Sequence, residues 1–149
     1  SGGGSTAGFG ANVTYEDCLF DSNAARFGGG TYAQNDFTSL TFKNTTFFSN
    51  TAEETGAGAL FSDGQNVTIE NCSFEGNQSS NIAGGLFMGE DSLDLSTLNL
   101  TNTIFNFNLA ETQGGALNIG NANSFQIRPE NSPFFKVGIF LSPPDSYMK

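Results

Sequence analysis

The chain has 149 residues, of which 37% are hydrophobic and 13% are charged, with 16 phenylalanines and neither histidine nor tryptophan. This composition is typical of one globular domain rather than of a disordered or multidomain protein. Fifteen acidic residues against five basic ones give a net charge of -10, which leaves too little positive charge to bind a row of phosphates. We therefore expect no nucleic acid partner. We also expect no membrane insertion, because the apolar runs fall far short of the roughly 20 residues that cross a bilayer.

A short motif of apolar, polar and apolar residues recurs along the chain with a period of about 27 residues, lengthened once to about 31. Its copies are Val13–Tyr15, Leu40–Phe42, Val67–Ile69, Leu98–Leu100 and Phe125–Ile127. Each copy alternates in polarity and is rich in β-branched and aromatic residues, which is typical of a short strand with one buried face. One repeat cannot bury such a face alone, but stacked repeats form a continuous core. The sequence therefore predicts an all-β fold, a parallel β-helix of about five coils with about 27 residues each, right-handed by the general preference of parallel connections.

A phenylalanine follows the start of each of the first four copies by seven residues, and an asparagine follows that phenylalanine by three. The phenylalanines are Phe20, Phe47, Phe74 and Phe105, and the asparagines are Asn23, Asn50, Asn77 and Asn108. Both sets are predicted to form a structural ladder. We expect the rings to point inward and stack along the axis. We expect the asparagines at the bend that follows, with a left-handed backbone and with amides that bond to the coils above and below.

A knot of small residues followed by bulky ones completes each repeat. Its copies are Gly28–Tyr32, Gly56–Leu60, Gly84–Phe87 and Gly114–Leu117, with a related segment at Gly2–Thr6. These glycines predict a tight turn and a close approach of neighbouring backbones. Paired once per coil, the FxxN and GGA[LIV]-type motifs resemble the repeats of the polymorphic outer membrane proteins, a family of surface autotransporters. The resemblance covers roughly residues 1–127 and implies a pectin-lyase-like right-handed β-helix exposed on a cell surface.

The repeat divides the chain into two regions. Residues 1–127 hold the β-helix repeats, with coils starting near 13, 40, 67, 98 and 125 and a partial coil at 1–12. Residues 128–149 break the repeat, because Pro129 and Pro133 forbid regular ladder pairing. We expect 128–149 to be either a C-terminal cap over the last coil or an assembly segment that docks on another subunit. The first coil has no cap, so a longer chain or a second subunit is expected to cover it.

The two cysteines occupy equivalent positions two repeats apart. Cys18 and Cys72 share their register with Thr45 and Thr103. Two coils at about 4.8 Å each put the cysteine Cα atoms farther apart than the roughly 7 Å that a disulfide allows. Both thiols are therefore predicted to be free. Because the chain has no histidine, neither thiol is expected to belong to a zinc site.

Six asparagines stand in acceptor sequences for N-linked glycosylation, and one of them, Asn77, is a ladder residue that we expect to stay bare. The remaining candidates are Asn12, Asn44, Asn66, Asn71 and Asn99. These five are candidates for glycosylation in a chain that enters a eukaryotic secretory pathway.

The sequence gives little support to catalysis. Polysaccharide-cleaving sites need a base or paired carboxylates held close together. No two of the five basic residues of this chain share a register beside aligned carboxylates. The column of Glu16, Lys43, Glu70 and Thr101 is more simply a solvated ladder with modest ion pairing. We predict no catalytic residues and no cofactor.

A four-residue insertion distinguishes the longest repeat from the others. It contains Glu90, Asp91 and Asp94, which make a weak calcium candidate. The spacing of an EF-hand is absent, and acidic loops are usually only soluble. We therefore predict no metal site.

These features favour a non-enzymatic extracellular structural protein, a β-helical module of a cell-surface adhesin or filamentous appendage, secreted or held at the cell surface. Its expected partners are a second copy or a longer chain joined end to end, and glycans or other surface proteins. The alternative is a carbohydrate-binding or carbohydrate-active β-helix of the polysaccharide lyase or hydrolase kind. A polyanionic substrate fits this alternative poorly, because the chain itself carries a net charge of -10.

Overall fold

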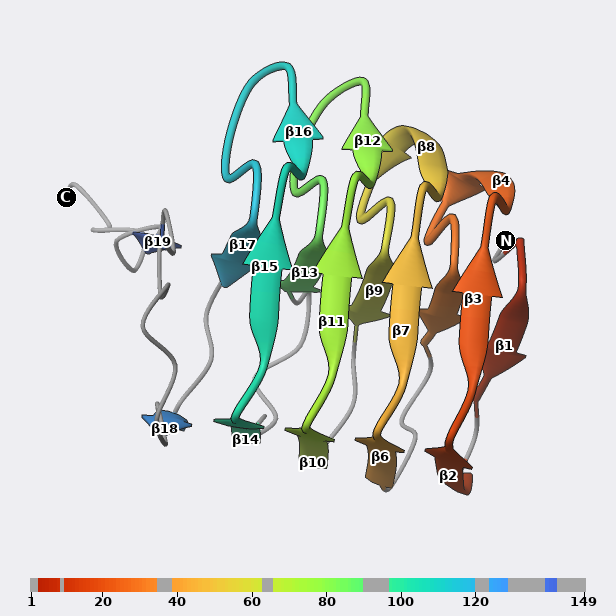
Figure 1. Ribbon diagram of the computed structural model, residues 1–149, viewed down its shortest axis with the longest axis vertical. Coiled ribbons are helices and arrows are strands. Elements are labelled where there is room, and N and C mark those ends of the chain that lie inside the picture. Colours follow the sequence, from red (N-terminus) through yellow and green to blue (C-terminus); the bar gives the residue numbers. More distant parts are fainter. Residues whose placement is uncertain are drawn as a thin grey trace, which may run out of the picture.

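The protein winds into a solenoid of four parallel β-sheets (Figure 1). This computed structural model describes residues 3–8, 10–34, 39–62, 66–89, 97–119, 124–128 and 139–141. Sheet A contains β1 (Ser5–Ala7), β5 (Thr31–Ala33), β9 (Ala59–Ser62), β13 (Leu86–Gly89), β17 (Leu117–Ile119) and β19 (Ile139–Leu141). Sheet B contains β2 (Asn12–Glu16), β6 (Ser39–Lys43), β10 (Asn66–Glu70), β14 (Thr97–Thr101) and β18 (Ser124–Arg128).

The two other sheets are built from shorter strands. Sheet C contains β3 (Leu19–Asp21), β7 (Thr46–Phe48), β11 (Ser73–Glu75) and β15 (Ile104–Asn106). Sheet D contains β4 (Ala24–Phe27), β8 (Thr51–Thr55), β12 (Gln78–Ser79) and β16 (Leu109–Ala110). Among the described residues, no helix is long and apolar enough to cross a membrane.

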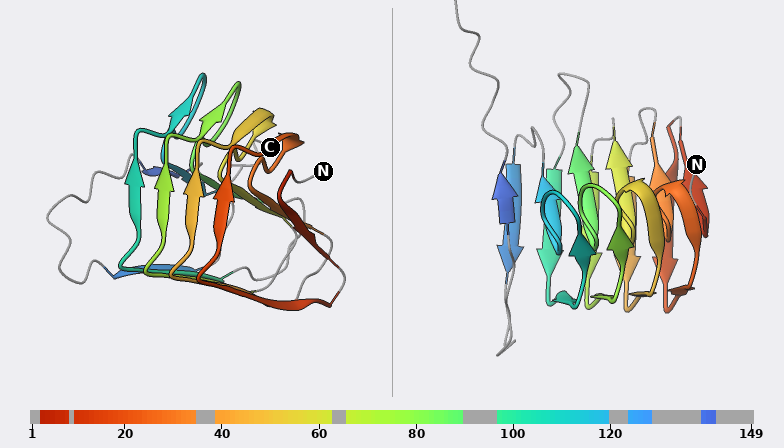
Figure 2. Two further views of the ribbon diagram at one scale, coloured as in Figure 1. Left: turned by 45° about the vertical axis from the view of Figure 1, so that its right-hand side comes forward. Right: turned by 90° about the horizontal axis from the view of Figure 1, so that it is seen from above.

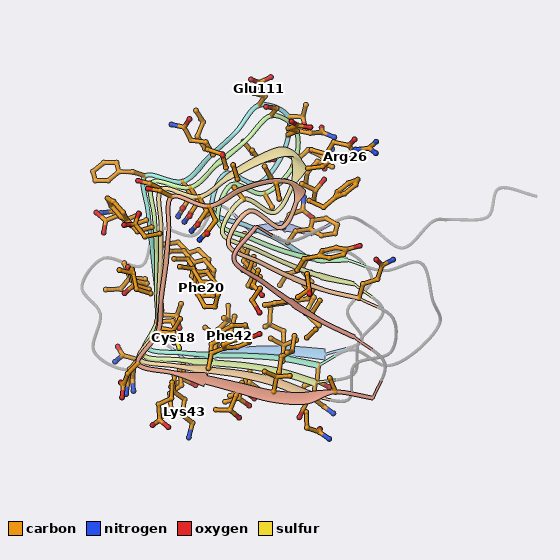
Figure 3. The ribbon with its side chains drawn as sticks, turned by 90° about the vertical axis from the view of Figure 1, so that its right-hand side faces the viewer. Cys18, Phe20, Arg26, Phe42, Lys43 and Glu111 are labelled. Atoms are coloured by element: carbon orange, nitrogen blue, oxygen red, sulfur yellow. The ribbon has the colours of Figure 1, made fainter. Side chains whose placement is uncertain are left out.

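Each turn passes through the sheets in the order B, C, D, A, and neighbouring strands in a sheet come from successive turns. Seen from the N-terminal end, the chain runs clockwise as it recedes, so the solenoid is right-handed (Figure 3). The predicted parallel β-helix is therefore confirmed. The structure has about four turns with strands in all four sheets, and about 27 residues make one turn. Of the fifth predicted coil, β18 and β19 lie within the described residues.

Alternating polarity decides which side of each sheet B strand is buried. In β10 the side chains of Val67 and Ile69 are fully buried, and Asn66, Thr68 and Glu70 face outward. The register persists through the longest repeat, because each residue of β10 pairs with the equivalent residue of β14, from Asn66 with Thr97 to Glu70 with Thr101. The extra residues therefore fall between β13 and β14. The calcium candidates Glu90, Asp91 and Asp94 lie there, outside the described residues.

Sheets A, B and C enclose the hydrophobic core, and sheet D forms a lobe along one side of the solenoid (Figures 2 and 3). The largest fully buried rings come from the three enclosing sheets, Phe61 from sheet A, Phe42 from sheet B, and Phe47 and Phe74 from sheet C. Burying one such ring contributes about 2 kcal/mol to folding. The core is thus a stack of repeated layers that no single coil could form alone.

Residues with a left-handed backbone make the corners between sheets. The corner after sheet B is formed by Asp17, Asn44, Asn71 and Asn102, with φ between 47° and 54°. The corner after sheet C is formed by Ser22, Ser49, Gly76 and Phe107. The expectation that the FxxN asparagines adopt this conformation is therefore wrong, because the residue before each of them does so. This arrangement lets the backbone N–H groups of Asn23, Asn50 and Asn77 point along the axis toward the next coil.

Close packing between coils explains the glycine knots. A Cβ built on Gly58 would overlap the carbonyl oxygen of Gly85 in the next coil and would lie 2.8 Å from Cδ1 of Phe74. The same overlap recurs at Gly30 with the carbonyl oxygen of Gly58. Gly28 and Gly56 begin their knots with φ of 59° and 69°, a conformation that glycine adopts without strain. The glycines of the knots therefore allow the backbones of successive coils to pack closely.

Candidate functional site

The four motif phenylalanines form a single stack along the axis of the solenoid. Ring centroids of Phe20 and Phe47 lie 4.8 Å apart, those of Phe47 and Phe74 4.4 Å, and those of Phe74 and Phe105 4.8 Å. The planes differ by no more than 9° in each pair. Phe47 and Phe74 are fully buried, and the rings at the two ends are 8% exposed. Stacking at the coil spacing gives every ring contacts on both faces except at the ends.

The asparagines of the same motif form an interior amide ladder. Oδ1 of Asn77 accepts hydrogen bonds from the backbone N–H and the side-chain Nδ2 of Asn50, at 3.0 and 2.9 Å. Nδ2 of Asn77 donates to Oδ1 of Asn108 at 2.8 Å and to the carbonyl oxygen of Phe47 at 3.0 Å. The pattern repeats between Asn23 and Asn50. Each buried amide thus joins three successive coils.

A second amide ladder runs along the outside of the corner after sheet B. Asn44 donates from Nδ2 to Oδ1 of Asp17 at 3.1 Å, Asn71 to Asn44 at 3.4 Å, and Asn102 to Asn71 at 2.8 Å. This column was not predicted from the sequence, although its members share a register with the predicted repeats. Its signal was available, because asparagine is the side chain that best tolerates a left-handed corner.

At the position after this corner, threonine and cysteine side chains form the same kind of hydrogen bond to the backbone. The hydroxyls of Thr45 and Thr103 donate to the carbonyl oxygens two residues earlier, at 2.8 and 3.0 Å. The thiols of Cys18 and Cys72 make the equivalent contact at 3.2 Å. Both cysteines are free, as predicted. Burial raises the pKa of the Cys72 thiol above its ordinary value, so this thiol stays protonated at neutral pH.

The glycosylation candidates lie in different surroundings. Asn12 and Asn66 are exposed at the first position of sheet B strands, and Asn99 is half-buried in the middle of β14. Asn44 and Asn71 are exposed, but they are rungs of the exterior ladder. The sixth acceptor sequence, at Asn77, belongs to a fully buried side chain.

The surface of sheet D holds an open groove with a volume of about 480 Å³. Its floor is made of small side chains, including Ala25, Ala52 and Ser79. The groove runs across all four strands of the sheet, from Arg26 in β4 to Glu111 just after β16, and Figure 3 shows both labelled residues on the lobe. The sequence analysis did not identify this groove, because the strands that shape it lack the apolar alternation of sheet B.

Charged and polar groups line the groove. Nε of Arg26 pairs with Oε1 of Glu54 at 2.6 Å, and its guanidinium lies over the ring of Phe27 at 5.1 Å. Glu53 and Glu111 are exposed and have no ion-pair partner among the described residues. The groove therefore offers carboxylate oxygens and a restrained guanidinium to a ligand, together with the small polar side chains of its floor. Such a surface is suited to binding by hydrogen bonds.

The charged column predicted on sheet B lies on the solvent side. Glu16, Lys43, Glu70 and Thr101 are paired residue by residue across β2, β6, β10 and β14. Nζ of Lys43 lies 4.0 Å from Oε2 of Glu70, and the two side chains are 44% and 43% exposed. An exposed pair at this distance contributes little to stability. Within the described residues, no three side chains of the metal-binding types cluster together.

Comparisons with known proteins returned no match, since no family model, no curated protein and no solved structure is similar to the chain. The resemblance to surface autotransporter repeats therefore stays a prediction, and the function is inferred from the repeated residues and their geometry.

Proposed function

We propose that the chain is a non-enzymatic extracellular structural protein, a β-helical module of a cell-surface adhesin or filamentous appendage. In this role the solenoid is a spacer whose length and shape matter, and it joins a longer chain or a second copy end to end. Its resemblance to surface repeats supports the extracellular location. Glycans and other surface proteins are the contacts that such a module would make.

The observation that carries this proposal is the use of the repeated side chains within the solenoid. The best-aligned groups of the repeat are the FxxN rings and amides. The rings stack on those of the next coil, and the amides form hydrogen bonds to the next coil. A catalytic site would need nucleophilic or acid–base side chains that converge where a substrate can reach them. In this chain the aligned rings and amides join successive coils along the axis, and such contacts are what a rod requires.

Electron microscopy of the purified chain over a range of concentrations tests this proposal. We expect single short particles at low concentration and rods of constant width that lengthen as concentration rises, because end-to-end contacts preserve the cross-section. Globular clusters that grow in width would contradict it.

A second candidate function is carbohydrate binding, and the groove on sheet D favours it. The groove crosses four successive coils and is lined by small, polar and charged side chains, so an extended polymer lying in it would contact each coil in turn. We expect a neutral polymer to bind better than an anionic one. Among the described residues, Arg26 is the basic side chain that lines the groove, and it is already paired with Glu54.

Incubation with a panel of neutral and anionic polysaccharides separates the two candidates. Gln78→Trp fills the groove, and Gln126→Trp on sheet B is the control. Loss of polysaccharide binding in the first variant, with binding kept in the second, would establish the carbohydrate function. New reducing or unsaturated ends that appear with the wild-type chain and not with Glu53→Gln would establish an enzyme and refute the structural proposal. We expect neither result.

A further inference from the structure

The fold places the six acceptor sequences for N-linked glycans in three kinds of surroundings. Asn12 and Asn66 are exposed and point outward from the first position of β2 and β10. Asn44 and Asn71 are rungs of the exterior amide ladder. The remaining two are buried to different degrees, since Asn77 has no exposed surface and Asn99 is half-buried in β14.

We propose that Asn12 and Asn66 are the two sites of N-linked glycosylation in this part of the chain, and that the other four acceptor asparagines stay bare. This inference rests on the extracellular location in the proposed function, reached through a eukaryotic secretory pathway. Glycans are added to the chain before it folds, so the fold acts by selecting which modified chains reach the native state. A site is compatible with folding only where the amide nitrogen and the sugar on it can remain in solvent.

The surroundings of Asn12 meet this condition. Its Oδ1 accepts a hydrogen bond from the hydroxyl of Ser39 at 2.7 Å. The hydrogen bond from the neighbouring coil therefore involves the oxygen of the Asn12 amide. The sugar would be attached to the nitrogen of the same amide. Asn66 occupies the same column two coils later, with the same exposure.

Asn77 fails the condition most clearly. Its Nδ2 donates to Oδ1 of Asn108 and to the carbonyl oxygen of Phe47, so both amide hydrogens are used inside the protein. A sugar would replace one of these hydrogens and would have to occupy space in the close-packed core around a fully buried side chain. A chain modified at this position could not complete the interior ladder.

The exterior ladder excludes Asn44 and Asn71 for a related reason. The nitrogen of each amide donates to the rung before it, and the oxygen of each accepts from the rung after it. Rungs are about 4.8 Å apart, and a pyranose ring is wider than this spacing. The ladder uses one hydrogen of each nitrogen, so a sugar would replace the other hydrogen, and its ring would crowd the side chain of the neighbouring rung.

Asn99 lies in the central outward column of sheet B, half-buried beside Thr68. A glycan there would have to lie across the columns on both sides of it. Asn12 and Asn66 instead share one margin of the sheet, two rungs or about 10 Å apart. Their glycans would cover that margin and leave sheet C and the groove of sheet D uncovered.

The test is secretion of the 149-residue chain from a eukaryotic cell line behind a secretion signal, followed by mapping of each acceptor asparagine. Enzymatic release of the glycans in heavy-oxygen water converts each occupied asparagine to a labelled aspartate that mass spectrometry identifies. We expect label at Asn12 and Asn66 and at no other position. Label at any of the other four acceptor asparagines in folded, secreted protein would overturn the proposal, and so would its absence from both Asn12 and Asn66.

Variants that remove only the acceptor threonine make the assignment independent of folding. Thr14→Ala and Thr68→Ala should each remove one glycan, whereas Thr41→Ala, in the same column but outside any acceptor sequence, should remove none. All three bacterially produced variants should melt at the temperature of the unmodified chain. Loss of a glycan in Thr41→Ala, or no loss in the other two, would refute the proposal. A bare protein that still forms rods would refute the glycan sites and leave the structural proposal intact.

Discussion

A single amide side chain can hold three coils together, and Asn77 is the clearest case. Replacement of Asn77 by Ala leaves the buried N–H groups of Asn50 and the carbonyl oxygen of Phe47 without partners. Each buried polar group that loses its partner costs about 1–3 kcal/mol. We predict that this substitution lowers the free energy of unfolding by about 3–5 kcal/mol, measured by urea denaturation.

The exterior ladder provides the matched control for this prediction. Asn44→Ala removes an amide whose partners are exposed to water, so we expect a loss below about 1 kcal/mol. Equal losses in the two variants would contradict the distinct roles of the interior and exterior ladders.

Phe107 is strained and exposed at the same time. It has φ of 53° and is 81% exposed, at a corner where the earlier coils have Ser22, Ser49 and Gly76. A bulky residue in the left-handed region costs about 1–2 kcal/mol. We predict that Phe107→Asn raises the free energy of unfolding by about 1 kcal/mol in thermal or urea denaturation. A loss of stability would show that the ring makes contacts that outweigh its backbone strain.

Cys72 gives a prediction about pH. Because burial raises its folded pKa, the neutral thiol is favoured in the native state. This contribution to stability is complete below the ordinary thiol pKa and is lost as pH rises through the higher folded pKa. We expect stability to fall in alkaline solution, and this part of the fall to be absent in Cys72→Thr, which copies Thr45 and Thr103 of the same column. An identical alkaline fall in both proteins would contradict it.

At the scale of elements, the glycine knots set how closely the coils approach. Gly58→Ala puts a methyl group against the backbone of the next coil, so we predict a loss of more than about 3 kcal/mol. Gly10→Ala separates backbone strain from steric overlap, because Gly10 has a positive φ, which Gly58 does not, and a Cβ on Gly10 meets no atom within 4 Å. We expect that variant to lose about 1 kcal/mol from backbone strain alone. Urea denaturation of both proteins compares the two effects.

The strands differ in how well the sequence predicts them. Those of sheet B are predicted because their apolar and polar residues alternate, and β3, β7, β11 and β15 because each places a phenylalanine at its centre. The strands of sheet D carry no such pattern. Their buried positions hold small side chains such as Ala52 and Ser79, which have no apolar signal, and β12 and β16 are only two residues long.

The candidate site was predictable to a similar extent. The interior ladder follows from the FxxN spacing, since repeated residues in one register must stack. The hydrogen-bond donors and acceptors of the ladder do not follow from this spacing. They depend on whether the asparagine or the residue before it adopts the left-handed backbone conformation. The groove depends on the path of the lobe, which the small residues of sheet D do not reveal.

For the whole molecule, the four turns place residues far apart in sequence at regular intervals along one axis. Thr14, Thr41, Thr68, Asn99 and Gln126 are aligned in successive strands of sheet B. The distance between any two of them should therefore depend on the number of coils that separate them, at about 4.8 Å per coil. In a globular arrangement of the same strands, the distance would not increase in proportion to the number of repeats between the two residues.

Distances between spin labels on this column test the solenoid most directly. Labels are attached to cysteines at positions 14 and 99, or 14 and 126, in a chain whose Cys18 and Cys72 are replaced by Thr. We predict mean separations of about 14 Å for three coils and about 19 Å for four, in proportion to the coil number. Separations that fail to increase from the first pair to the second would contradict a chain that completes one turn of the solenoid with every repeat.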